Sequence, residues 1–540
     1  MKMPTVMRQQ KFARTPVANI PRSVFDRSHK YATTFDQGFL IPVLCDWVFP
    51  GDTINCRMTA FARLATPSKP LMDNMYLDSF FFFIPNRLVW DNWTKFMGEQ
   101  EDPGDSIAYT IPQTTIVAGY STGHLGDYFG LPVGVAAGSP AWTHSALPIR
   151  GYFRVWNEWF RDENLQDSVS EDGTSGTSPN YGNGPDAQSV WPLNRGKRHD
   201  YFTSCLPWQQ KGTAVSLVGD VISDDTTPQL YGVTSSSLGT LAANTVGGVL
   251  RATTGAWTVG EDVRFNSSNT GLTIDTNTIN EFREAYQIQR LLERSARSGT
   301  RYPEVIRSVF GVTDPSHLVL QRTEYLGGGS TPLNMNTVSQ GGADASGTPT
   351  AGKGRTGVFG EVGGVGTFVA SRHGFVKSFT EHGIVLGLVS VRLDLSYHQG
   401  LQREWSWETR YDFYVPDLAH LGEQAVLNQE IYIQGAAADA SAFGYQERWA
   451  EMRYKPSRVT GQFRSNTSGG PTTLDVWHLA EDFAALPTLN STFIEDNLRA
   501  TVDRVILIPS EPHFFFDAWF DYRCARPMPV YSVPGLVERL

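Results

Sequence analysis

The stretch that decides the fold is Tyr76–Ile84, which reads YLDSFFFFI. Within it, Phe80–Ile84 places a large apolar side chain at every position, so both faces of an extended segment would be apolar. Such a strand must be covered on both sides, and Pro85 follows as a stop. A second aromatic strand is predicted at Phe514–Arg523, which reads FFFDAWFDYR. We therefore expect aromatic strands at the centre of the fold.

Further strands are predicted outward from these two. Phe39–Cys45 and Thr53–Leu64 precede the central strand, and Gly366–Tyr397 contains Val385–Leu395 as its longest run. Shorter strands are expected at His199–Leu206, Ser441–Tyr445, Asp475–Ala480 and Arg504–Ile508. Residues 326–366 are rich in glycine and are predicted to form a long loop.

Helical signals are few. Thr278–Glu281 fits a capping box, apolar residues then follow a 3.6-residue period, and Gly299 suits a C-terminal cap. The pattern predicts a helix over residues 279–297. Arg87–Met97 is expected to form a short helix, whereas Gly151–Arg161 could be a strand or a helix.

The chain of 540 residues shows no alternation of strands with helices. Glycine and proline together number 82, a content typical of many short strands joined by turns. We therefore predict an all-β fold, an antiparallel sandwich with large loop insertions and a few short helices.

Residues 213–276 differ in composition from their surroundings. Of these 64 residues, 27 are Gly, Ser or Thr, and six acids stand against two arginines. This composition is typical of an insertion exposed to solvent, with short patches that suggest small hairpins.

Charge is unevenly distributed along the chain. Residues 1–35 carry seven Lys or Arg and one acid, which gives +6 for this segment and leaves −16 for the rest of a chain whose net charge is −10. A basic arm on an acidic body suits binding to a polyanion, although a solvated tail has the same composition. The candidate DNA-binding residues are Arg8, Lys11, Arg14, Arg22, Arg27 and Lys30.

Three aromatic residues, Phe12, Phe25 and Tyr31, lie among these cations. Aromatic side chains in a basic segment can stack on single-stranded bases. They could equally anchor the arm to a neighbouring subunit, and the sequence leaves both alternatives open.

No catalytic or metal-binding pattern emerges. The four cysteines are scattered without a CxxC pair, the eleven histidines are dispersed, and nucleotide-binding and hydrolase motifs are missing. The carboxylate pairs Glu404/Glu408 and Asp517/Asp521 have arginines close in sequence, so ion pairing explains them better than glycoside hydrolysis. We expect no enzyme, no cofactor, no metal, no secretory signal and no membrane insertion.

Several stretches closely resemble the major capsid proteins of microviruses, in particular the gokushovirus type that infects bacteria. They occur in the family's order along nearly the whole chain: RSVFDRSHK (22–30), FPGDTIN (49–55), MTAFARLATP (58–67), MDNMYLDSFFFFIPNRLVWDNWTKFMGEQ (72–100), RGKRHDYFTSCLPWQQKG (195–212), EAYQIQRLLERSARSGTRYPEVI (284–306), FGYQERWAEMRYKPS (443–457) and RCARPMPVYSVPGL (523–536). The resemblance is weak in residues 102–148, 165–194 and above all 213–276.

The resemblance implies an eight-stranded jelly roll and a T=1 icosahedral shell of 60 copies around circular single-stranded DNA. Its partners would be an internal scaffolding protein, a pilot protein, a small DNA-binding protein and a receptor on the bacterial surface. The chain would then divide into an interior-facing arm (1–35), a first part of the jelly roll (36–212), a threefold protrusion (213–276) and a second part with an extended tail (277–540). We expect the protein in the virion, after synthesis and assembly in the host cytoplasm. The alternative is a carbohydrate-binding or carbohydrate-cleaving β-sandwich.

Overall fold

The structure is a computed structural model that describes residues 21–531 with gaps. The gaps are residue 107 and the ranges 117–118, 136–140, 172–189, 314–320, 340–361 and 465–473, and within 216–278 only short strands are described. The chain divides into two compact units, one formed by the residues up to Pro207 together with those from Val312, the other by Trp208–Gly311.

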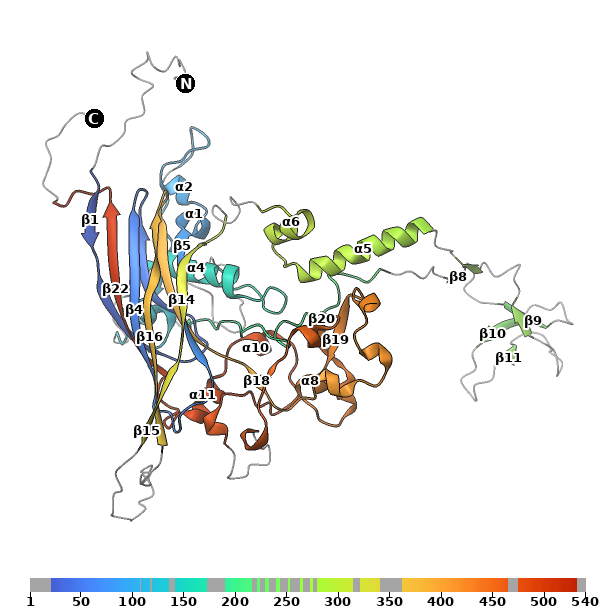
Figure 1. Ribbon diagram of the computed structural model, residues 1–540. Helices are drawn as coiled ribbons and strands as arrows, with labels where there is room; N and C mark the ends of the chain where they lie inside the picture. Colours follow the sequence, from blue (N-terminus) through green and yellow to red (C-terminus); the bar gives the residue numbers. More distant parts are fainter. Residues whose placement is uncertain are drawn as a thin grey trace. The chain divides into compact units, whose positions relative to one another are not determined.

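The first unit is built on two antiparallel sheets (Figure 1). The six-stranded sheet contains β1 (Ser23–Asp26), β2 (His29–Phe35), β22 (Phe514–Arg526), β4 (Thr53–Leu64), β16 (Val362–Ser378) and β15 (Asn334–Ser339). The four-stranded sheet has the order β14 (Glu324–Pro332), β5 (Met75–Pro85), β17 (Gly383–Leu393) and β3 (Ile41–Val48). This architecture confirms the predicted all-β sandwich. The two sheets hold ten described strands, whereas the resemblance implied eight.

The extra strands have a simple origin. β1 and β2 pair with successive segments of β22, and β15 adds to the edge of β16. Without β1 and β15, eight strands remain: β2, β22, β4 and β16 in one sheet, and β3, β17, β5 and β14 in the other. The first and last strands are thus neighbours, with Ser23 opposite Arg526.

The main core lies between the two sheets. Along β4 every second side chain is buried, including Met58 and Ala60, while the residues between them face solvent. On β5, Phe81 and Phe83 enter the same core. Period-two alternation therefore gives β4 one buried face, as expected for an antiparallel sheet with one wet side.

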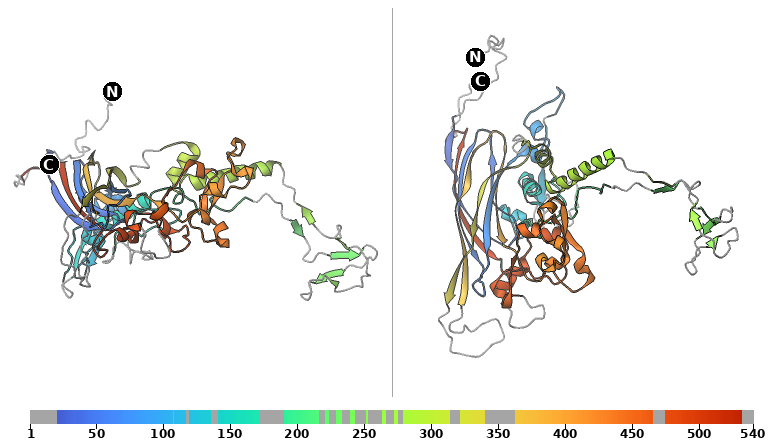
Figure 2. Two further views of the ribbon diagram at one scale, coloured as in Figure 1. Left: turned by 60° about the horizontal axis from the view of Figure 1, so that its bottom comes forward. Right: turned by 45° about the vertical axis from the view of Figure 1, so that its right-hand side comes forward.

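A second apolar layer covers the other side of the four-stranded sheet. The cyan helix of residues 147–155 lies on this side (Figure 2). Phe82 and Ile84 of β5 pack there with Tyr152 and Phe153 of helix α4 (Leu147–Val155). The prediction that the Phe80–Ile84 segment is buried on both sides is therefore confirmed. The open choice for residues 151–161 is resolved as α4 followed by a π-helical turn, Trp156–Phe160.

Short elements make up the rest of the first unit. Its other helices are α1 (Asn86–Val89), α2 (Trp93–Phe96), α3 (Leu125–Tyr128), α8 (Asn428–Ile431), α9 (Ala450–Arg453), α10 (Ser491–Ile494) and α11 (Arg499–Val505). Small two-stranded sheets pair β6 (Gln113–Ile116) with β7 (Trp142–Ser145), β18 (Ser396–Tyr397) with β21 (Ser457–Arg458), and β19 (Glu423–Leu427) with β20 (Ala442–Glu447).

The described residues of the second unit form small strands and two helices. Its strands are β8 (Val221–Ser223), β9 (Gln229–Gly232), β10 (Gly239–Ala242), β11 (Arg251–Ala252), β12 (Val263–Phe265) and β13 (Leu272–Ile274). Helix α5 (Ile279–Arg297) has the predicted bounds, and Gly299 after it has φ 100°; Thr278 of the predicted capping box lies outside the described residues. Helix α6 (Tyr302–Phe310) follows, so this unit extends beyond the expected 213–276 on both sides.

The predicted long loop at 326–366 is wrong over its described ends, where β14, β15 and the start of β16 lie. Glycines mark close backbone approach here instead of flexibility. A Cβ atom on Gly328 would lie 2.0 Å from the carbonyl oxygen of Ser79 in β5. Only glycine therefore lets β14 pair with the aromatic strand at this position. β16, with 17 residues, is also longer than the Val385–Leu395 run.

Three predicted strands are wrong. Within residues 199–206 the chain turns at 201–204, because the Asp200 carboxylate accepts hydrogen bonds from the backbone N–H groups of Phe202 and Thr203, and only Leu206 makes an isolated bridge. Residues 475–477 form a 3₁₀ turn, and residues 499–505 form α11, so Arg504 lies in a helix.

The sheet also begins earlier than expected. The arm was assigned to residues 1–35, but β1 and β2 occupy Ser23–Phe35 and are integral strands of the six-stranded sheet. Only residues 1–20 lie outside the described chain on this side.

A buried carboxylate, Asp496, lies beneath the loop between β2 and β3. Its Oδ1 accepts a hydrogen bond from the side-chain amide of Gln37 at 2.5 Å, and its Oδ2 has no hydrogen-bond partner in the described structure. Burial raises the pKa of Asp496 to about 7, an effect that Gln37 and Lys197 partly oppose. The ionised form is therefore costly in the folded state.

We expect Asp496→Asn to stabilise the unassembled chain at pH 8. The folded-state pKa lies above the unfolded value of 3.8, so the native protein holds a proton that the unfolded chain releases, and wild-type stability falls as pH rises from about 4 through about 7. Each unit of pKa difference corresponds to about 1.4 kcal/mol. Urea unfolding from pH 4 to pH 8 measures the difference, with exposed Asp167→Asn as the control. An Asp496→Asn variant destabilised equally at all pH values would contradict this.

Candidate nucleic-acid interface

The residues predicted to bind DNA or to anchor the arm fall into two groups. Arg8, Lys11, Phe12 and Arg14 lie outside the described residues. Arg22, Phe25, Arg27, Lys30 and Tyr31 lie on or beside β1 and β2, at the edge of the six-stranded sheet. The second group can therefore be assigned contacts.

Arg27 is tied into the sandwich. Its guanidinium forms an ion pair with Asp46 of β3, whose side chain is largely buried, and lies 5.8 Å from the ring centroid of Tyr522. The Tyr522 hydroxyl donates to the same carboxylate at 2.8 Å, and Arg526 lies 3.8 Å from it. Burial is the largest cause that raises the pKa of Tyr522, so its hydroxyl stays a donor. Arg27 thus links the first strands to β3 and β22.

Lys30 and Arg22 are more accessible. The Lys30 ammonium lies 2.8 Å from the Asp517 carboxylate, and both side chains are at least half exposed. Arg22 donates to the Thr53 hydroxyl at 2.7 Å on the surface. Exposed contacts of this kind contribute little to stability and can be exchanged for a phosphate.

The two described aromatic candidates face the protein. Phe25 is half-buried and lies opposite Cys524 in the sheet. The Tyr31 hydroxyl donates to the carbonyl of Tyr128 at 2.8 Å, and burial raises the pKa of Tyr31 to about 12. Tyr31 thus has the contacts of an anchor within its own chain, which leaves it poorly placed to stack on a base, whereas Phe25 is placed only by its strand pairing.

A different surface carries exposed aromatic and basic side chains together, and sequence reasoning missed it. We call it the β4–β22 face: the solvent-facing side of the six-stranded sheet with Arg57, Thr59, Phe61 and Arg63 of β4, Phe515 and Trp519 of β22, and Val369 and Arg372 of β16. The signal was available in the alternation of TINCRMTAFARL and FFFDAWFDYR, because both runs were identified as strands. The solvent-facing residues of each strand were not distinguished from the buried ones.

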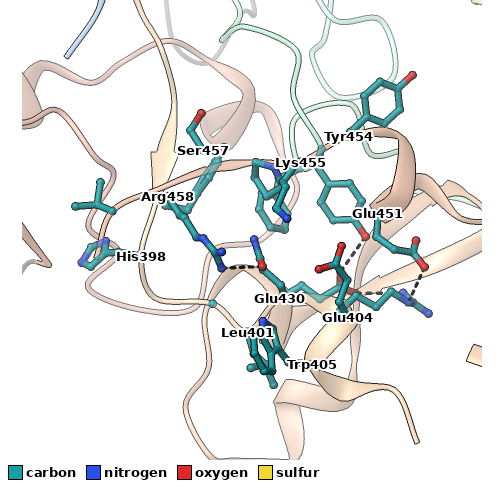
Figure 3. Close-up of a pocket in the computed structure, with 18 of the residues that line it drawn as sticks. His398, Leu401, Glu404, Trp405, Glu430, Glu451, Tyr454, Lys455, Ser457 and Arg458 are labelled. Carbon is teal, nitrogen blue, oxygen red and sulfur yellow. Dashed lines mark hydrogen bonds and ion pairs between the residues drawn. The ribbon is translucent and has the colours of Figure 1, made fainter. Parts of the chain in front are cut away.

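The structure also contains a pocket between the turns near residues 398–405 and 451–464, with a volume of about 210 Å³ (Figure 3). Glu430 and Glu451 lie on the side away from His398. Glu430 is buried, which raises its pKa, but it accepts hydrogen bonds from Tyr201 at 2.8 Å, Arg403 at 3.1 Å and a backbone N–H at 2.9 Å. A carboxylate so fully partnered fits a structural role better than proton transfer.

Of the two carboxylate pairs considered from sequence, Asp517 and Asp521 form ion pairs close to them. Asp517 pairs with Lys30, and Asp521 lies 3.4 Å from Arg523. Among the described residues no group of three or more His, Cys, Asp or Glu side chains could hold a metal ion. Within the same residues, no helix combines the length and the apolar character needed to cross a membrane.

The fold is that of an antiparallel β-sandwich protein with long insertions. Comparisons with known proteins show the family to which it belongs. A family model described as "Capsid protein (F protein)" matches residues 13–536. Proteins named capsid protein VP1 are similar over nearly their whole lengths: 41% identity in Bdellovibrio phage phiMH2K, with all of both chains covered, and 39% in Chlamydia phage 1, with 99% of each.

A third relative, capsid protein VP1 of Spiroplasma virus 4, is 34% identical over 96% of each chain. The chain belongs to the F-type capsid protein family of microviruses. The resemblance drawn from sequence is confirmed, and membership identifies a structural, non-enzymatic protein of the virion that associates with itself in a shell. The relatives favour the capsid interpretation over a carbohydrate-active protein.

We expect Arg27→Gln to destabilise the unassembled chain and Lys30→Gln to leave it unchanged. Arg27 pairs with a largely buried carboxylate, so its loss costs about 1 kcal/mol after allowance for its partly exposed side chain. The exposed Lys30 pair should change stability by less than about 0.5 kcal/mol. Urea unfolding compares the two variants. Equal losses would show that Arg27 has no special structural role.

Proposed function

We propose that this chain is the major capsid protein of a microvirus, that 60 copies form a T=1 icosahedral shell, and that the shell packages circular single-stranded DNA. The observation that carries the proposal is the end-to-end similarity to three proteins named capsid protein VP1. The sandwich with long insertions supports it, since rigid sheets can present long loops as contacts between copies. Assembly in the host cytoplasm, with scaffolding, pilot and DNA-binding proteins, belongs to the same proposal.

The N-terminal residues support an interior role for the arm. Residues 1–20 contain Lys2, Arg8, Lys11 and Arg14 and no acid. Lysine and arginine release condensed counterions when they neutralise phosphates, which gives a favourable and salt-dependent contribution to binding. Because Arg27 supports the sandwich, the four cations of residues 1–20 are the cleaner targets for a test.

The segment 213–276 is proposed to form a surface protrusion that contributes to attachment to the bacterial host. Its Gly, Ser and Thr content and acidic balance suit a solvent-facing excursion. Doubling the length of a loop costs only about 0.6 kcal/mol, so a long insertion is compatible with a stable sandwich. Exposed loops on rigid scaffolds commonly carry recognition.

A direct test is electron microscopy of the expressed chain and of native particles, which should show icosahedral shells of 60 copies. We further expect particles made with Lys2, Arg8, Lys11 and Arg14 all changed to Gln to contain less DNA, because each copy then carries four fewer charges for phosphate. Absorbance ratios and sedimentation separate filled from empty particles. Normal DNA content together with defective shells would instead assign the arm to contacts between subunits.

Replacing residues 213–276 by a short Gly-Ser linker should leave shell formation intact and abolish adsorption to host cells. The cut spares helix α5, which begins at Ile279. Particle yield and an adsorption assay, performed on the same preparations, provide the measurement. Failure to form shells would identify the insertion as a contact between copies, and normal adsorption would place attachment elsewhere.

A further inference from the structure

The β4–β22 face has an unusual composition for the wet side of an antiparallel sheet. Such a side normally carries polar residues, since the opposite side already supplies the core. Here Phe61 is 48% exposed, Phe515 is 42% exposed and Trp519 is 53% exposed. Large aromatic side chains left in solvent on one continuous face indicate a surface that binds something.

Strand register brings these rings together. Arg63 lies opposite Phe515, Phe61 opposite Asp517, and Thr59 opposite Trp519. Phe61 is therefore the diagonal neighbour of both Phe515 and Trp519, at a spacing of roughly 7–8 Å between such positions. The three rings form a staggered row across two adjacent strands, with their faces partly open to solvent.

Three arginines stand beside this row, and none has a partner in the part of the chain that the structure describes. Arg57, Arg63 and Arg372 make no hydrogen bond or ion pair within these described residues. By contrast, the acids of the same face are neutralised locally, Asp517 by Lys30 and Asp521 by Arg523. The unneutralised charge on the β4–β22 face is therefore positive, although the chain as a whole carries −10.

The position of Arg372 results from a β-bulge in β16. The register shifts between Ala370 and His373, so Ser371 and Arg372 together stand opposite Thr59. Arg372 has φ 62°, a left-handed conformation uncommon for a residue with a side chain. Bulges commonly redirect a side chain, and this one leaves Arg372 exposed beside the aromatic row.

We propose that the β4–β22 face binds single-stranded nucleic acid, with Phe61, Phe515 and Trp519 stacking on unpaired bases and Arg57, Arg63 and Arg372 contacting phosphates. Rings on a sheet surface can stack only on bases whose faces are free, which a duplex does not offer. This inference rests on the proposed packaging of single-stranded DNA and assigns it a surface. The basic residues 1–20 precede β1, which lies at the edge of the same sheet.

A second copy of the chain is the alternative occupant, and the charges argue against it. If the face met its own equivalent across a twofold axis, its three arginines would approach three others. Burying like charges without partners is strongly unfavourable. A polyanion supplies the missing negative charges and leaves the aromatic rings to stack.

The test measures binding of the purified full-length chain to a fluorescent 20-nucleotide oligothymidylate and to a duplex of equal length. Phe61→Ala and Trp519→Ala should each weaken binding to the single strand by about fivefold or more, with less effect on the duplex. Arg57→Gln combined with Arg63→Gln should reduce the slope of log affinity against log salt by about 0.7 for each phosphate that the protein no longer neutralises. Melting curves confirm that the variants are folded.

Matched controls come from exposed residues elsewhere in the first unit. Trp405→Ala removes a ring that is 74% exposed near the pocket, and Arg410→Gln with Arg453→Gln removes two charges. These should leave oligonucleotide binding unchanged. Unaltered binding in the β4–β22 variants, or equal losses in the controls, would overturn the inference. Normal oligonucleotide binding with failed shell assembly would assign the face to a contact between copies.

The result of the binding test can be distinguished from the result of the test of shell formation. Loss of oligonucleotide binding in the face variants supports the inference even if the wild-type chain forms no shells. If wild-type chain forms shells but binds oligothymidylate no better than the Trp519→Ala variant, the inference is overturned and the capsid assignment stands.

Discussion

The structure depends on the burial of β5 on both faces. Phe81 and Phe83 fill the space between the sheets, while Phe82 and Ile84 pack under α4. Because successive side chains of a strand point to opposite sides, one uninterrupted apolar run joins three layers. The four-stranded sheet is therefore an interior layer, and the six-stranded sheet is the one that keeps a solvent-facing side.

The pairing of the first strands with the last one shapes the chain's basic segment. β1 and β2 add to β22, and Arg27 reaches Asp46 and Tyr522 beneath them. The segment predicted as one basic arm is therefore divided in the structure. Its later residues are strands of the sandwich, and residues 1–20 lie outside the described chain.

The elements with correctly predicted bounds are those that depend on residues close to one another in the sequence. β4 has the predicted bounds because its alternation is unbroken, and α5 has the predicted bounds because its apolar period and Gly299 coincide. Long-range contacts explain the failures. In the sequence Gly328 is typical of a loop, but in the fold its backbone lies close to Ser79 of β5. Asp200 lies in a predicted strand, but its side chain accepts a backbone hydrogen bond that turns the chain. The same reason hid the role of Arg27, since nothing in the sequence places Asp46 beside it.

The aromatic row on the β4–β22 face is the feature that folding does not explain. Met58 and Ala60 already supply the buried side of β4, so Phe61 adds nothing to the core. Exposed apolar rings at a sheet surface instead favour unwanted association. The three arginines of the same face, which lack partners among the described residues, oppose association with like copies while attracting an anion. The composition of this face therefore suits a partner that carries both negative charge and flat apolar surfaces, and unpaired nucleotides provide both.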